Sequence, residues 1–241
     1  IPTFIVGASQ WFGLLIPGIS RAAFSSMYQG AVRNNTTIGL VIAGLIMPGQ
    51  GVAVMALIMT IMVIINNITC VTVLTHYGDA SLREAASQNK SMLRKLAGNP
   101  LILASVLGLG FNFLSIPLPS SLHSAIYFLG QTGLPLALLA VGAGLNLTTF
   151  LGKTFALGWS TIAKLAGMPA LIYLFVGYLD LSADDARILV LYGGLPTAMS
   201  SYVLSSQLGG DKETMAQIIT VQTLLAAFSL PLVLLAIQKI A

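Results

Sequence analysis

The stretch at residues 191–201 interrupts an apolar segment that is long enough to cross a bilayer. Pro196 removes a backbone donor and clashes with the carbonyl one turn back, which breaks or kinks a helix. Gly193 and Gly194 precede it and let the backbone leave helical geometry at low steric cost. A break inside hydrocarbon is tolerated only where it is buried in protein or lines a wet cavity. The stretch therefore predicts either a cavity inside the membrane or a proline kink that serves packing alone.

A second apolar segment, residues 22–47, carries charge and amides in its middle at residues 28–37. Aligning Tyr28 with Tyr192 also places Gly30 on Gly194. Two interrupted spans in corresponding halves of a chain are the best sequence pointer to the binding site of a solute carrier. We therefore expect the two breaks to meet near the middle of the membrane.

The composition supports a membrane protein, because 56% of the 241 residues are hydrophobic and only 7% are charged. A soluble domain carries about 25% charged residues. At roughly 20 residues per span, the length fits about eight helices. The single Cys70 excludes an internal disulfide and a cysteine metal cluster, and the two histidines lack ligand spacing, so we expect no metal site.

Eight apolar segments are interpreted as membrane helices, the second and the seventh interrupted. The predicted spans are residues 1–19, 22–47, 52–75, 99–114, 120–147, 149–178, 186–208 and 213–240. The polar segment 79–97 is predicted to be an amphipathic helix on the membrane surface. Its basic residues place it in the cytoplasm by the positive-inside rule. Seven of the 11 Lys and Arg residues then lie on that side, which explains the net charge of +4 without nucleic acid as a partner.

Several motifs occur in a specific order along the chain. They are Arg33-Asn34-Asn35-Thr36, Asn99-Pro100-Leu101 after a basic loop, Lys164 followed by Met168-Pro169, Leu195-Pro196 with Ser200-Ser201, and Gly210-Asp211. In this order the chain resembles the auxin efflux carrier family, and its bacterial members in particular. The resemblance implies an all-α, polytopic membrane helix bundle of ten helices in two inverted five-helix repeats. The fourth and ninth helices of that plan are broken and cross.

The eight predicted spans match the third to tenth helices of that plan, so the chain looks incomplete at its N-terminal end. Residues 1–78 would hold three spans of the first repeat, and residues 79–98 a cytoplasmic amphipathic linker. Residues 99–241 would then form the five spans of the second repeat.

The resemblance also implies the substrate class. Family members export or exchange organic anions, namely indole acetate in plants and dicarboxylates such as malonate or malate in bacteria. Arg33 stands where plant carriers have proline before the crossover asparagine, which we match to Asn34. This difference disfavours an auxin-like substrate.

We therefore predict a secondary active transporter of a small mono- or dicarboxylate, working by alternating access in the bacterial inner membrane. It is not expected to be an enzyme or to use a cofactor. Its partners would be the organic anion, a proton or sodium as coupling ion, and the lipid bilayer, with a homodimer left open. The alternative is a sodium-coupled symporter of the bile-acid symporter kind, which shares the crossed-helix plan.

The candidate site residues lie at the two breaks. The expected substrate-binding residues are Arg33, Asn34, Asn35, Thr36, Pro196, Thr197 and Ser200. Arg33 is favoured because a basic residue near mid-membrane usually faces a cavity or a partner, and its planar guanidinium suits a carboxylate. The alternatives are that it pairs with a helix-end carbonyl or lies nearer the membrane interface. Lys164 is the candidate for ion coupling. The alternatives are that it binds the substrate or that its side chain reaches the membrane interface. The amides Asn67, Asn146 and Gln222 are expected to join helices rather than bind a ligand.

Overall fold

The computed structural model describes residues 1–79 and 154–238, with residues 107, 110–111, 113–114, 117–129 and 132 between them. All regular structure in these residues is helical, so the predicted all-α membrane helix bundle is confirmed for this part of the chain. The predicted linker, most of the fourth and fifth predicted spans, and Asn146 lie outside the described residues.

The first predicted span is divided into a short α-helix and a 3₁₀ helix. Helix α1 is Pro2–Ser9 and η1 is Gln10–Leu15. The chain then reverses through a turn at Gly18, whose φ of 89° favours glycine. This turn leads directly into the first broken helix.

The second span is broken where the sequence predicts. Helix α2 is Arg21–Val32, and Ser20 is its N-cap. The Ser20 hydroxyl accepts a hydrogen bond from the Ala23 N–H. Residues 33–35 are extended. Helix α3, Thr36–Ile46, follows them, with Asn35 as its N-cap. Every residue of α2 from Ala23 to Val32 is buried. Its polar side chains therefore need partners within the protein.

Three helices are long and apolar enough to cross a membrane by length and composition. They are α4, Gln50–Tyr77; the segment Phe155–Val176; and α13, Lys212–Ile237. The apolar window of α4 is 22% buried, against 44% and 39% for the other two. Much of the outer surface of α4 is thus available for lipid or for other helices.

The segment Phe155–Val176 contains a change of helical geometry. Helix α9, Thr154–Ile162, passes into a π-helical turn, η2, Ala163–Gly167, and then into α10, Met168–Val176. Pi-helical turns inside α-helices are frequent at functional sites. This one carries Lys164.

The seventh span is broken, but its break begins later than the glycines suggest. Helix α11, Ala183–Gly194, includes both Gly193 and Gly194, and α12, Ser200–Leu208, follows after residues 195–199. The two glycines instead permit close packing, because a Cβ on Gly193 would lie 3.1 Å from Pro169 Cα and one on Gly194 would lie 3.0 Å from Val233 Cγ2.

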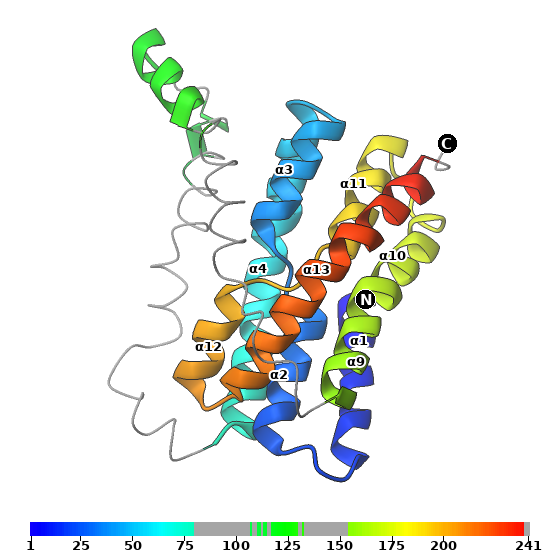
Figure 1. The fold of residues 1–241 in the computed structure, drawn as a ribbon. Coiled ribbons are helices and arrows are strands. Elements are labelled where there is room, and N and C mark those ends of the chain that lie inside the picture. Colours follow the sequence, from blue (N-terminus) through cyan, green and yellow to red (C-terminus); the bar gives the residue numbers. More distant parts are fainter. Residues whose placement is uncertain are drawn as a thin grey trace.

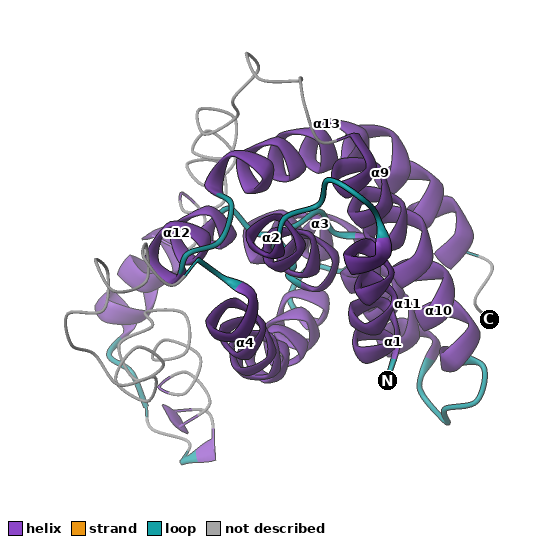
Figure 2. Cartoon of the chain, turned by 90° about the horizontal axis from the view of Figure 1, so that it is seen from below, coloured by secondary structure: helices purple, strands orange, loops and turns teal. Residues whose placement is uncertain are grey.

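The two broken helices cross in opposite directions. Helix α2 lies beside α12 on one side of the crossing, and α3 lies near α11 on the other (Figure 1). Seen from the end, α2 and α3 lie in the middle, with α4 and α13 on opposite sides (Figure 2). The predicted meeting of the two breaks is confirmed, and it sets the frame for the site.

Candidate functional site

The two broken helices are joined by one hydrogen bond between their backbones and by one from a side-chain hydroxyl to a backbone carbonyl. The Asn35 N–H donates to the carbonyl oxygen of Pro196 at 2.7 Å. The Thr197 hydroxyl donates to the carbonyl oxygen of Gln29 at 3.3 Å. A broken helix exposes peptide groups that hydrocarbon cannot satisfy, and here each break supplies partners for the other.

Two side-chain amides satisfy further backbone groups of the breaks. Gln222 of α13 is fully buried; its Nε2 donates to the carbonyl oxygen of Gly30 and its Oε1 accepts from the Thr197 N–H, both at 3.0 Å. Asn66 of α4 donates to the carbonyl oxygen of Val32 at 3.1 Å. Gln222 therefore joins helices, as expected for an amide inside a span.

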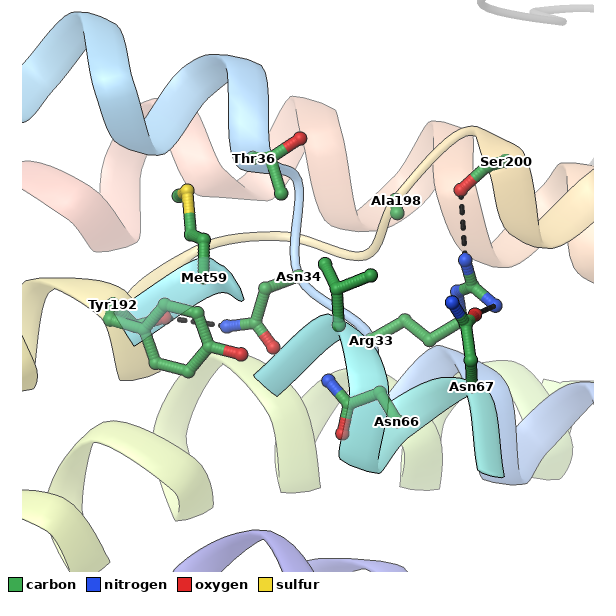
Figure 3. A pocket seen from close by; sticks show the side chains of 10 residues that line it. Arg33, Asn34, Thr36, Met59, Asn66, Asn67, Tyr192, Ala198 and Ser200 are labelled. Atoms are coloured by element: carbon green, nitrogen blue, oxygen red, sulfur yellow. Dashed lines mark hydrogen bonds between the residues drawn. The ribbon is translucent and has the colours of Figure 1, made fainter. Parts of the chain in front are cut away.

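A pocket of about 330 Å³ opens beside the crossing. It is lined by Arg33, Asn34, Thr36, Met59, Val63, Asn66, Asn67, Tyr192, Ala198 and Ser200. Figure 3 shows Arg33 at one end, Tyr192 and Met59 at the other, and Asn34 between them.

Both half-helices that begin at the breaks contribute their first residue to this pocket. Thr36 is the first residue of α3, and Ser200 is the first residue of α12. A helix N-terminus carries a partial positive charge and unpaired N–H groups, which favour an anion. Two such ends at one pocket give it a positive bias before any charged side chain is counted.

Arg33 adds a full positive charge and connects the two breaks. Its Nη1 donates to Asn67 Oδ1 at 3.1 Å, and its Nη2 donates to Ser200 Oγ at 3.0 Å (Figure 3). Both partners are neutral, and within the part of the chain that the structure describes no carboxylate pairs with Arg33. Since a guanidinium has five N–H donors, it can still bind a carboxylate.

Lys164 lies behind the pocket rather than in its wall. Its side chain is fully buried, and its Nζ donates to Asn34 Oδ1 at 2.8 Å. The Asn34 Nδ2 in turn donates to the carbonyl oxygen of Tyr192 at 2.6 Å. Lys164 therefore does not reach the interface, and it contacts the pocket through Asn34.

The structure thus divides the predicted site residues into two groups. Arg33, Asn34, Thr36 and Ser200 line the pocket. Asn35, Pro196 and Thr197 lie at the joint itself. The Asn35 side chain caps α3. The Pro196 carbonyl and the Thr197 hydroxyl bond to the first broken helix, and the Thr197 N–H bonds to Gln222 of α13. The predicted site did not include Asn66, Met59 or Tyr192, which also line the pocket. Periodicity alone does not show that Met59 and Asn66 of α4 face the breaks.

The chemistry of the pocket is that of hydrogen-bond donors facing a small volume. Arginine, amides, hydroxyls and helix N-termini suit a carboxylate. Among residues 1–79 and 154–238, no group of three or more His, Cys, Asp or Glu side chains could hold a metal ion. The arrangement fits reversible binding of a small anion.

The chain matches the membrane transport protein family over residues 22–234. This range includes both broken helices and Lys164. A relative from Rhizobium meliloti (strain 1021), which bears the name "Putative malonate transporter", is 31% identical over 189 residues. The matched part is 74% of this chain and 59% of that relative, so the chain spans less than two thirds of the relative's length.

Proposed function

The chain belongs to the membrane transport protein family, and from this premise we propose that its crossing is the substrate site of a secondary active transporter for small organic anions. The observation that carries the proposal is the position of Arg33, which reaches from one break to Ser200 at the start of the other. An anion bound to Arg33 would also lie beside the positive ends of α3 and α12. One ligand would thereby contact both broken helices.

Contact with both helices suits alternating access. A carrier exposes one central site to each side of the membrane in turn, largely by moving one bundle against the other around that site. We propose that, on binding, the carboxylate of the anion displaces Asn67 and Ser200, which are the two neutral partners of Arg33. Loaded and empty states would then differ in the contacts that hold the two breaks together.

We propose a mono- or dicarboxylate of the size of malonate as substrate. The name of the relative from Rhizobium meliloti supports malonate as the first compound to test. The pocket supports a small anion through its volume and its donors. We place the protein in the bacterial inner membrane, working as an exporter or exchanger.

For the coupling ion we propose a proton, with Lys164 as the group that carries it. Lys164 is a buried amine in direct contact with a residue of the pocket wall. Sodium coupling is the alternative, and an imposed ion gradient distinguishes the two.

The test is transport of radiolabelled malonate by the purified protein in proteoliposomes. We expect accumulation driven by a pH gradient, competition by unlabelled malonate, and much weaker competition by the neutral malonamide. Vesicles without protein and vesicles with Arg33→Gln protein are the controls. Accumulation driven by a sodium gradient at constant pH would show that the coupling ion is sodium and not a proton. Absence of malonate transport and binding in a well-folded protein would refute the proposed substrate.

A further inference from the structure

Asn34 is held at both ends of its side-chain amide. Lys164 donates to its Oδ1 at 2.8 Å, and its Nδ2 donates to the backbone oxygen of Tyr192 at 2.6 Å (Figure 3 shows the second bond). Asn34 lines the pocket, whereas Lys164 is fully buried behind it. Any influence of Lys164 through contact therefore passes through Asn34.

The two neighbours permit only one orientation of this amide. The lysine ammonium has only donors, and a backbone carbonyl only accepts. Reversing the amide would place its oxygen against the Tyr192 oxygen and its nitrogen against the ammonium. In the orientation present, the acceptor Oδ1 is engaged by Lys164, and the amide nitrogen keeps one N–H to spare.

We propose that Lys164 is a positioning residue that makes Asn34 present a donor, not an acceptor, to the anion. The inference rests on the proposed function, since it concerns the same pocket. Without a donor at position 164, Oδ1 would be buried and unpaired, which is unfavourable. The amide would then turn its oxygen toward the polar pocket, where it would repel a carboxylate.

A pair of substitutions separates this role from a role of the lysine charge. Lys164→Gln and Lys164→Met both remove the charge and leave an unbranched side chain, but only glutamine can donate to Asn34 Oδ1. Malonate affinity is measured by calorimetry on the full chain purified in detergent. Malonamide serves as a neutral analogue, and Lys212→Met removes an exposed lysine as a control.

We expect Lys164→Met to weaken malonate binding by about 10- to 100-fold, or about 1.4–2.8 kcal/mol at 1.4 kcal/mol per tenfold. Lys164→Gln keeps a donor for Asn34 and should bind malonate clearly more tightly than Lys164→Met. Malonamide, which can donate to the released Oδ1, should lose no affinity in Lys164→Met, whereas a merely structural defect would weaken both ligands alike. In an Asn34→Ala background, Lys164→Met should have a clearly smaller effect than in the wild type.

Equal losses in the glutamine and methionine variants would overturn the inference and assign the effect to the charge. An undiminished effect of Lys164→Met in the Asn34→Ala background would overturn it as well. If the wild-type protein bound no malonate, the proposed function would fail first, and this inference with it. The two failures are therefore distinguished by the wild-type measurement.

Discussion

The backbone N–H of Asn35 and the carbonyl oxygen of Pro196 form a 2.7 Å hydrogen bond that joins the two broken helices at their crossing. Proline has no N–H of its own, but its carbonyl is free to accept. The bond lies next to Arg33, so the backbone joint and the positive side chain occupy the same place in the fold. A movement that separates the two broken helices must break this hydrogen bond. A movement that keeps the bond must shift both breaks as one unit.

Substitution of Arg33 tests the anion site. A lysine keeps the positive charge but loses the planar guanidinium group, and a glutamine loses both. A charge-assisted hydrogen bond contributes about 1.5–3 kcal/mol, so we expect Arg33→Gln to weaken malonate binding by about 10- to 200-fold. Arg33→Lys should retain weak binding, and Arg33→Gln should tolerate malonamide better relative to malonate. Calorimetry gives the affinity per folded molecule.

Arg21→Gln is the matched control, because Arg21 donates to the His76 carbonyl at the far end of α2. It should leave malonate affinity unchanged. If Arg33→Gln were well folded and bound malonate as tightly as this control, Arg33 would be removed from the site. Its role would then be to hold the two breaks together.

Removal of the Gln222 amide should destabilise the fold. Gln222→Leu would leave the Gly30 carbonyl and the Thr197 N–H buried without their partner. Each such group costs about 1–3 kcal/mol, which gives about 2–6 kcal/mol in total. Thermal unfolding in detergent measures the effect against Gln207→Leu, a change at an exposed position of α12. Equal melting temperatures for the two variants would contradict the bridging role.

Gly193 should tolerate no side chain. A Cβ there would lie 2.7 Å from Ile172 Cδ1 and 3.1 Å from the Pro169 Cα, and this backbone cannot move without disturbing α10. Overpacking of this kind costs about 1–3 kcal/mol. Gly158→Ala is the control, because no atom lies within 4 Å of its added Cβ. Gly193→Ala should melt clearly below Gly158→Ala, and the reverse order would refute the packing argument.

Asn35 should contribute to stability rather than to affinity. Its Oδ1 accepts from the Ile38 N–H at 3.2 Å and so caps α3. Asn35→Ala should cost about 0.5–2 kcal/mol, while Asn35→Ser should keep the cap. Melting temperature and malonate affinity are measured together. If the Asn35→Ser protein were stable but no longer bound malonate, the Asn35 side chain would have to be a substrate-binding group.

The crossing could be predicted from sequence because its signals are local. Pro196 and the polar stretch around Arg33 both interrupt apolar spans, and Asn35 is a recognisable helix cap. Only the extent of the second break differs, because Gly193 and Gly194 stay in α11 and serve close packing.

The partners of the site residues could not be predicted in the same way. Lys164 and Asn34 are 130 positions apart, and their contact depends on how the π-helical turn presents the lysine to the crossing. The bond from Gln222 to Gly30 spans 192 positions. Such pairings follow from the packing of whole helices, which a single sequence does not specify.

The most direct test is a crystal structure of the protein with bromomalonate, whose bromine gives an anomalous signal. We expect the bromine peak in the pocket beside the crossing, with a carboxylate about 3 Å from the Arg33 guanidinium, a normal hydrogen-bond distance. Ser200 or Asn67 should then have released Arg33. A bromine peak elsewhere, with Arg33 still bonded to Asn67 and Ser200, would contradict the claim that the crossing binds the anion.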